Sequence, residues 1–124
     1  MRKPSKKTLI KKCDKLWRDI IKLRAKGKCE LCNNPGIDAH HIIGRRNFTL
    51  RWDLRNGIYL CFNHHYGLNS AHQNPIWFEE ELRKLKGDRL VEQLKFASQV
   101  IIKRSLADYQ ELHTNLKHIL EAIK

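Results

Sequence analysis

The sequence predicts a mainly helical α+β protein with a small, metal-stabilised β-region at its centre. Apolar residues recur at helical spacing in residues 8–26 and again in residues 76–124. Between these segments, residues 28–75 lose the helical period and hold two short apolar runs that suit strands. The same central stretch contains three of the four cysteines and five of the seven histidines. We therefore expect metal binding to stabilise it.

Length and composition limit the number of domains. A chain of 124 residues with 41% hydrophobic content suits one compact domain, or a small catalytic module with a helical appendage. We divide it into a basic N-terminal helix (1–27), a central module (28–75) and a C-terminal helical region (76–124).

The N-terminal helix is predicted from an apolar stripe on one face and basic residues on the other. Gly27 is placed to end this helix in a left-handed conformation. Cys13 falls on the stripe, so we expect a core residue rather than a metal ligand. The stripe consists of Leu9, Ile10, Cys13, Leu16, Trp17, Ile20 and Ile21.

The formal charge of +12 indicates a polyanionic partner, and we expect DNA. Residues 1–28 hold twelve lysines and arginines against only two acidic residues, so nearly all of the excess charge lies there. The alternative is a solvated helix face that only aids solubility. The candidate phosphate contacts on this helix are Lys11, Lys12, Lys15, Arg18 and Lys22.

The order of elements in the central module is predicted as strand, loop, strand, helix. A knuckle and turn over residues 29–36 precede an extended segment, 37–43. An arginine-rich loop, 44–56, leads to a second strand, 57–60, that returns antiparallel to the first. Residues 62–71 suit a short helix, which ends before Pro75 because the residue preceding proline avoids the α region.

Three apolar stripes predict helices in the C-terminal region. The first, residues 77–85, is ended by Gly87, and the second runs over residues 90–101. The third, residues 106–123, starts at a capping box formed by Ser105 and Asp108. These stripes predict core or subunit contacts. Packing within the chain and dimerisation both remain open.

Two pairs of residues predict a structural zinc site. Cys29-x-x-Cys32 and Cys61-x-x-His64 each place two ligands across one tight turn. Two such turns brought together make a closed tetrahedral site with three thiolates and one imidazole. Zinc would also compensate for the low apolar content of residues 28–75.

The remaining histidines of the module predict a second, open metal position. His64 and His65 are adjacent on a helix, so their side chains point about 100° apart and cannot easily bind the same ion. His40 and His41 similarly point to opposite faces of a strand. One histidine of the helix can therefore face the zinc while the other faces a different site.

These motifs resemble the HNH, or ββα-metal, nuclease superfamily over about residues 28–75. The resemblance rests on His40-His41, on Asn56 five residues before Cys61, and on Cys61-x-x-His64-His65. The sequence departs from the family pattern at His64, which stands where the family usually has its last zinc-binding cysteine.

The resemblance implies a role for each matching residue in a DNA endonuclease. His41 would be the general base that activates water, and Asn56 would orient His41 or complete the metal shell. His40 and His65 would hold the catalytic divalent ion. Similar enzymes break one phosphodiester bond, which we expect here as a nick, and leave 5′-phosphate and 3′-hydroxyl ends.

His72 is the third candidate ligand of that ion, because it lies two turns after His65 if the helix persists. The alternative is a surface histidine at a helix end. An all-imidazole site favours Mn²⁺, Ni²⁺, Co²⁺ or Zn²⁺ over Mg²⁺, although Mg²⁺ remains an option.

The arginine-rich loop adds phosphate contacts and a narrower resemblance. Arg45 and Arg46 follow the first strand closely and are candidates for gripping phosphates beside the cleavage point. The run Arg51-Trp52-Asp53 ahead of Asn56 resembles phage recombination nucleases of the NinG type, which implies a role in recombination or genome processing. For Trp52 itself we favour core packing under the zinc knuckle, and Arg51 and Arg55 can pair with Asp53 or Asp38.

Two other functional classes remain beside the endonuclease. A zinc-ribbon DNA-binding module without catalysis would keep the zinc ligands and the basic helix, but would not need His40, His41, Asn56 and His65 in this order. A nuclease or binder directed at RNA is the third, since charge alone does not separate the two nucleic acids. No segment has membrane-spanning length, and the N-terminus lacks the apolar core of a signal peptide. We expect a cytoplasmic protein, in the host cytoplasm if it is phage-encoded.

Overall fold

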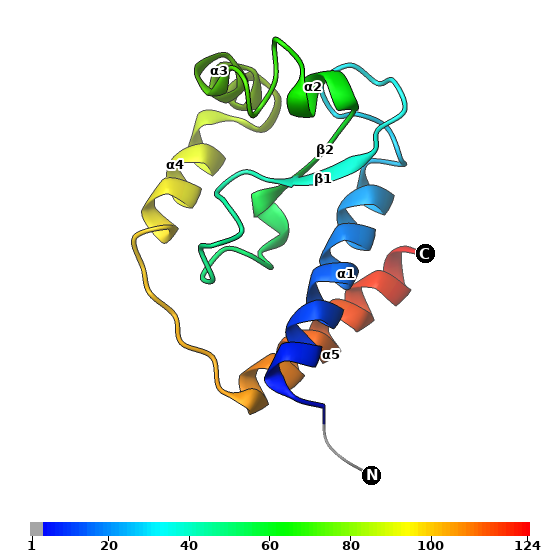
Figure 1. Cartoon of the computed structure of the whole chain (residues 1–124), viewed down its shortest axis with the longest axis vertical. Helices are drawn as coiled ribbons and strands as arrows, with labels where there is room; N and C mark the ends of the chain where they lie inside the picture. The colour runs from blue at the N-terminus through cyan, green and yellow to red at the C-terminus, as the bar shows by residue number, and fades with distance from the viewer. Residues whose placement is uncertain (1–3) are drawn as a thin grey trace.

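The computed structural model describes residues 4–124 and contains six helical segments and one small antiparallel sheet (Figure 1). This architecture confirms the prediction of a mainly helical α+β chain. The first three residues, which include Arg2 and Lys3 of the basic segment, lie outside the described part. In chain order the elements are α1 (Lys6–Arg24), β1 (Asp38–His41), η1 (Leu54–Asn56), β2 (Gly57–Leu60), α2 (Phe62–Tyr66), α3 (Pro75–Lys86), α4 (Asp88–Ala97) and α5 (Leu106–Ile123).

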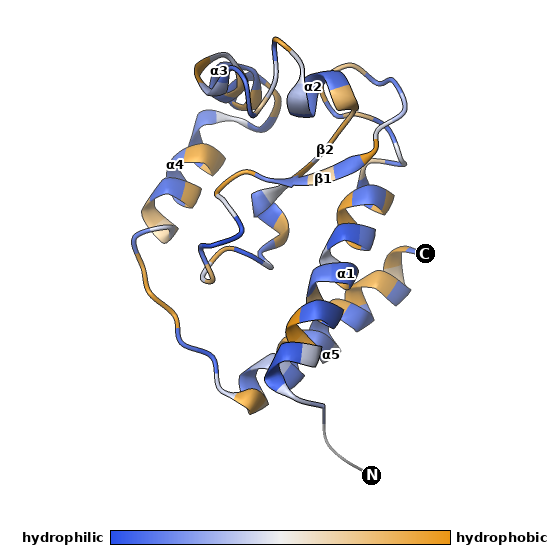
Figure 2. Cartoon of the chain, viewed as in Figure 1, coloured by the Kyte–Doolittle hydropathy of each residue, from blue (hydrophilic) through white to orange (hydrophobic). Residues whose placement is uncertain are grey.

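Helix α1 forms as the stripe predicts. The hydroxyl of Ser5 caps its first turn by accepting a hydrogen bond from the backbone of Thr8. Lys26 and Gly27 follow its end with φ of 56° and 72°, so the chain leaves the helix through the left-handed region, as expected at Gly27. Figure 2 shows that hydrophilic and hydrophobic residues alternate in bands along α1. Its buried residues are Leu9, Cys13, Trp17, Ile20 and Ile21, which confirms Cys13 as a core residue.

The sheet pairs β1 with β2 in antiparallel register, and its two faces pack against different helices. His40 pairs with Ile58, and His41 pairs with Gly57. Residues that pair across the strands point to the same face, so the two histidines face opposite sides. A Cβ at Gly57 would lie 2.5 Å from an Ile21 side-chain atom, so α1 packs directly on this backbone.

Two apolar clusters cover these faces. The cluster on the α1 side joins α1, Trp52 and Tyr59 to α5. The cluster on the other side joins Ile58 and Leu60 to α3 and α4 through Phe78, Leu82 and Val91. The sheet is thus held between α1 on one face and the α3–α4 pair on the other.

Helix α5 lies along α1 (Figure 1). Tyr109, Leu116 and Leu120 share a core cluster with the apolar face of α1. The predicted capping box is present: the Ser105 hydroxyl accepts from the Asp108 backbone, and the Asp108 carboxylate accepts from the Ser105 backbone. The third stripe therefore packs within the chain.

The structure corrects three expectations about helix lengths and packing. The helix expected over residues 62–71 ends at Tyr66. The helix of the second stripe, α4, ends at Ala97 and is followed by a turn at residues 98–99. The chain then runs without helix to residue 105, beside the arginine-rich loop, and is held there by hydrogen bonds such as Ile102 N–H to Thr49 Oγ1. Trp52 is a core residue, but it packs edge-on against Tyr109 of α5 rather than under the knuckle. No helix within residues 4–124 combines the length and apolar character that crossing a bilayer requires.

Candidate metal centres and histidine cleft

Cys29, Cys32, Cys61 and His64 lie close enough together to hold a metal ion, with their ligand atoms all within 4.8 Å of one another. Cys32 Sγ lies 3.8 Å from Cys61 Sγ, and His64 Nδ1 lies 3.4 Å from Cys61 Sγ and 3.6 Å from Cys29 Sγ. Tetrahedral zinc with bonds of about 2.3 Å to sulfur and 2.0–2.1 Å to nitrogen gives edges of roughly 3.8 and 3.5 Å. The predicted ligand set is therefore brought together at spacings that suit zinc, and none of these cysteines forms a disulfide.

The knuckle that carries Cys29 and Cys32 is fixed to the sheet and to α3. Asn33 has a φ of 63°, which turns the chain sharply after Cys32. The Glu30 backbone N–H donates to the Tyr59 carbonyl, and the Glu30 carboxylate accepts from the Tyr59 N–H at 2.7 Å and from Lys86 Nζ at 2.6 Å. These contacts hold the first cysteine pair against the strand that leads into Cys61.

The local environment of Cys29 favours the thiolate, which is the form that binds zinc. Burial raises the pKa of its thiol, but hydrogen bonds from the backbone of Cys61, Leu31 and Cys32, with His64 beside the sulfur, outweigh burial and lower this pKa to about 7. A thiol with this pKa gives up its proton to a metal at neutral pH at little cost.

His40, His65 and His72 form the second cluster, again with their ligand nitrogens within 4.8 Å of one another. His65 Nε2 and His72 Nε2 are 3.1 Å apart. The His40 ring lies 5.0 Å from the His65 ring and 5.2 Å from the His72 ring, measured between centroids. Two imidazole nitrogens bound to one ion at about 2.1 Å, at angles near 90–110°, are roughly 3.0–3.4 Å apart. The spacing suits a shared ion.

His72 reaches this cluster by a different route from the one expected. Because α2 ends at Tyr66, His72 does not lie on its helical face. Instead the following loop folds back, and the backbone N–H groups of Ala71 and His72 donate to the carbonyls of His64 and His65. The Tyr66 ring stacks against the His72 ring, with 5.2 Å between centroids.

Asp38 also belongs to this site, although no motif in the sequence points to it. Its Oδ2 lies 3.0 Å from Nδ1 of His65. A ring nitrogen that donates to a carboxylate carries the proton, so the other nitrogen of His65 keeps its lone pair, directed toward His72. A carboxylate behind a metal-binding histidine is a common arrangement, because it fixes the tautomer and raises the basicity of the ligand. The strand spacing was the signal that could have found it, since Asp38 and His40 lie two residues apart on one face.

Burial favours the neutral form of two rings of this cluster, His40 and His72. It lowers the pKa of His40 to about 3, with further lowering from the neighbouring His65, His72 and His41. The pKa of His72 is also lowered by burial and by His65. Neutral imidazole is the form that binds a cation, so the surroundings of His40 and His72 favour binding a metal ion over binding a proton.

His41 lies on the other face of β1, where its ring stacks on Trp17 of α1 with 3.9 Å between centroids and 7° between planes. Its Nε2 lies 3.0 Å from the backbone carbonyl of Arg51. Since a carbonyl only accepts, Nε2 carries the proton and Nδ1 is left with the lone pair. Burial lowers the pKa of His41, the largest effect on this ring. His41 is thus placed as a neutral base with one free nitrogen.

Asn56 is buried between the two ends of the arginine-rich loop. Its Nδ2 donates to the carbonyls of Ile43 and Leu50, and its Oδ1 accepts from the Ile43 N–H. These partners occupy the side chain, so Asn56 acts on the site through the loop backbone and is not part of the three-histidine cluster. Asn56 thus closes the arginine-rich loop, and the backbone carbonyl of Arg51 in that loop accepts the hydrogen bond from His41.

One cleft, of about 380 Å³, is lined both by His41 and by the three-histidine cluster. His41 borders it beside the three-histidine cluster, and so do Arg18 of α1 and Arg45 of the loop. Of the other predicted phosphate contacts, Lys11, Lys12, Lys15 and Lys22 are exposed on α1, where Lys15 pairs with Asp19. Arg46 is exposed but borders a different hollow, beside the segment 98–102.

The other arginines of the loop have structural partners. Arg55 pairs with Asp53, as one of the expected alternatives. Arg51 pairs with Asp14 of α1 rather than with Asp53 or Asp38, which corrects that expectation.

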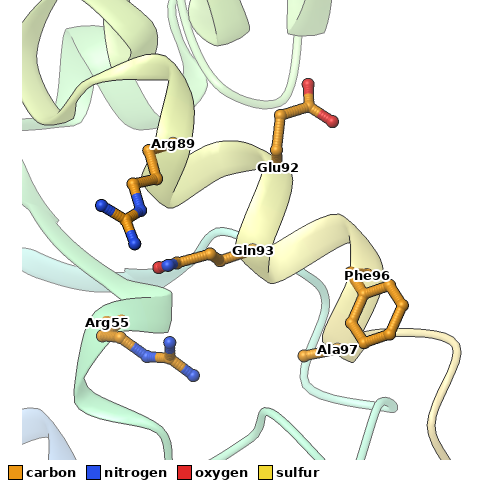
Figure 3. Close-up of a pocket in the computed structure, with 6 residues that line it drawn as sticks. All are labelled: Arg55, Arg89, Glu92, Gln93, Phe96 and Ala97. Carbon is orange, nitrogen blue, oxygen red and sulfur yellow. The ribbon is translucent and has the colours of Figure 1, made fainter.

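A larger hollow, of about 510 Å³, lies between η1 and α4 and contains no histidine or cysteine. Figure 3 shows Arg55 and Arg89 facing it from opposite walls, with Gln93 between them and Glu92 directed away. Of these two hollows, only the smaller cleft is lined by histidines.

Comparisons of the chain with protein-family models, with curated proteins and with solved structures find no match.

Proposed function

We propose that the chain is a divalent-metal-dependent DNA endonuclease of the HNH kind, with residues 28–75 as its catalytic module. One observation carries this proposal: His41, with a free Nδ1, borders the same cleft as the mutually adjacent nitrogens of His40, His65 and His72. A base beside a site for a cation is the pair of groups that metal-assisted phosphodiester hydrolysis requires.

In this proposal His41 Nδ1 accepts the proton of the attacking water, while Nε2 remains bonded to the Arg51 carbonyl. A neutral imidazole performs this step at neutral pH, and its lowered pKa keeps it neutral. The stacked Trp17 ring limits rotation of the imidazole, so its free nitrogen keeps one direction.

His40, His65 and His72 would hold the divalent ion. The lowered pKa values of His40 and His72, the 3.1 Å spacing of two Nε2 atoms and the carboxylate behind His65 fit this role. When bound, such an ion supplies Lewis-acid stabilisation of the charge that develops on the phosphate. The imidazole donors favour Mn²⁺, Ni²⁺ or Co²⁺, with Mg²⁺ as a further option.

The basic residues around the cleft would bind the DNA backbone. Arg18 and Arg45 border the cleft and are placed for the phosphates next to the cleavage point. Lys11, Lys15 and Lys22 extend the same charge along α1. These contacts position the duplex without reading its sequence.

Supercoiled plasmid tests the proposal. The zinc-loaded protein is incubated with plasmid and Mn²⁺, Ni²⁺ or Mg²⁺, beside His41→Ala and the control His118→Ala, an exposed residue of α5. We expect wild type and the control to nick the plasmid, leaving ends that a DNA ligase reseals, and His41→Ala to be at least about 100-fold slower. Unimpaired cutting by His41→Ala would remove the assignment of the base.

The non-catalytic zinc-ribbon module gives a different pattern in the same experiment. It would bind plasmid in a gel-shift assay and leave it intact with every ion. Cleavage of single-stranded RNA but not of DNA would instead assign the activity to RNA.

A further inference from the structure

Helix α1 lies outside the module that carries the histidines, yet two of its side chains reach the residues that hold His41. Trp17 stacks on the His41 ring, and its Nε1 donates to the Asp53 carbonyl at 3.0 Å. One turn earlier, the Asp14 carboxylate accepts from Arg51 Nε at 3.0 Å and from Arg51 Nη2 at 2.6 Å. Because Asp14 and Trp17 are three residues apart, they lie on the same face of the helix.

The contact between Asp14 and Arg51 is a paired, nearly buried ion pair. Two parallel hydrogen bonds join the guanidinium to both carboxylate oxygens, which fixes the angle as well as the distance. The Arg51 and Asp14 side chains are only 10% and 15% exposed. Asp14 Oδ1 also accepts from Trp52 Nε1 at 2.9 Å, so the carboxylate holds two consecutive residues of the loop.

Arg51 is the residue whose backbone carbonyl accepts the hydrogen bond from His41 Nε2. Fixing its side chain therefore fixes the group that determines which ring nitrogen of His41 carries the proton. Without that acceptor, the ring is free to place its proton on either nitrogen. With the proton on Nδ1, that nitrogen cannot take a proton from water.

We propose that Asp14 is a positioning residue for the hydrolysis proposed above: through Arg51 it holds His41 in the tautomer that leaves Nδ1 free in the cleft. This inference rests on the proposed function for its catalytic consequence, but not for the tautomer itself. It assigns helix α1 a second task, since the helix that carries the basic face also aligns the base.

The test compares Asp14→Asn and Asp14→Glu with Asp88→Asn, whose aspartate pairs with Arg83 at the surface and lies outside the site. Two-bond ¹H–¹⁵N spectra of the imidazoles show which nitrogen of His41 is protonated. Multiple-turnover cleavage rates over a range of DNA concentrations give kcat and KM. Circular dichroism and zinc content monitor the fold, so a variant that has lost its structure is recognised.

We expect Asp14→Asn to keep the fold and to show a mixture of His41 tautomers, with kcat lower by about tenfold and KM little changed, in the range known for residues that orient catalytic groups. Asp14→Glu should recover part of the loss, and Asp88→Asn should match wild type. A pure Nε2–H tautomer in folded Asp14→Asn would overturn the inference, and so would an unchanged kcat. If wild type cuts no DNA, the proposed nuclease activity fails, while the tautomer spectra still decide the role of Asp14.

Discussion

Asp38 Oδ2 lies 3.0 Å from Nδ1 of His65, and this contact joins strand β1 to helix α2. It gives His65 a defined tautomer and leaves its Nε2 facing His72 at 3.1 Å. We propose that an ion held by Cys29, Cys32, Cys61 and His64 keeps α2 against the strand pair and so maintains this contact. In this proposal the first cluster stabilises the fold, and the three-histidine cluster binds the second ion.

The knuckle should hold one tightly bound zinc ion per chain, and its loss should unfold the central module. Replacing Cys61 by Ser removes one thiolate, so we expect loss of zinc and a large drop in melting temperature, since structural zinc contributes apparent binding energies of about 10–16 kcal/mol in small domains. Elemental analysis and thermal unfolding measure both. Cys13→Ala is the matched control, because Cys13 is buried in the other core cluster and should leave zinc content unchanged.

The Cys13 thiol should resist alkylation over a wide pH range. Burial raises its pKa to about 11, with Asp14 adding to the effect, so the reactive thiolate is scarce below that pH. Iodoacetamide applied to the zinc-loaded protein at pH 8 should leave Cys13 unmodified by mass spectrometry. With zinc removed and the central module unfolded, Cys29, Cys32 and Cys61 should all react. Rapid labelling of Cys13 in the folded protein would contradict its place in the core.

The basic face of α1 should determine the salt dependence of DNA binding. Deleting the helix is not informative, because Trp17 and Ile21 belong to the core. Replacing Lys15, Arg18 and Lys22 by Ala should instead weaken binding and make the slope of log K against log salt shallower by about 0.9 for each phosphate that is no longer neutralised. Fluorescence anisotropy with a labelled duplex measures both quantities.

The control for that measurement is a variant in which three lysines outside α1 are replaced by Ala. Lys84, Lys95 and Lys103 are exposed and lie away from the cleft, so the control loses the same formal charge. Equal effects of the two triple variants would mean that total charge, and not the face of α1, governs the affinity.

Asn56→Ala should destabilise the whole chain. The side chain is fully buried and makes three hydrogen bonds to the loop backbone, whose groups the substitution leaves unsatisfied. We expect the free energy of unfolding to fall by about 2–3 kcal/mol in urea titrations. Asn56→Asp retains an acceptor for Ile43 but buries a carboxylate against the carbonyl oxygens of Ile43 and Leu50, so its loss should be at least as large. If Asn56→Ala were as stable as wild type, the Asn56 side chain would not be what holds the loop together.

Local spacing allowed the zinc ligands and two of the three clustered histidines to be predicted. Cys-x-x-Cys and Cys-x-x-His each fix a turn. Side chains alternate along a strand, so His40 and His41 point to opposite faces irrespective of the tertiary packing. His72 was also predicted, but from a helix that ends too early. The loop after Tyr66 brings it to His65 through backbone hydrogen bonds that no periodicity encodes.

Contacts distant in sequence could not be predicted. Asp14 and Arg51 are 37 residues apart, and their pairing depends on how α1 packs across the sheet. A local partner such as Asp53 was the natural expectation for Arg51, yet Asp53 is taken by Arg55. The stacking of Trp17 on His41 has the same origin, since the helical stripe identifies Trp17 as buried without identifying its neighbour.

The binding of a second, exchangeable ion tests the central claim most directly. Calorimetric titration of the zinc-loaded protein with Mn²⁺ or Ni²⁺ should show one further site per chain. That site should be absent from His65→Ala, in which the knuckle zinc remains, and retained in His118→Ala. A zinc-loaded wild-type protein that takes up no second ion, or a His65→Ala variant that binds it as wild type does, would contradict the account.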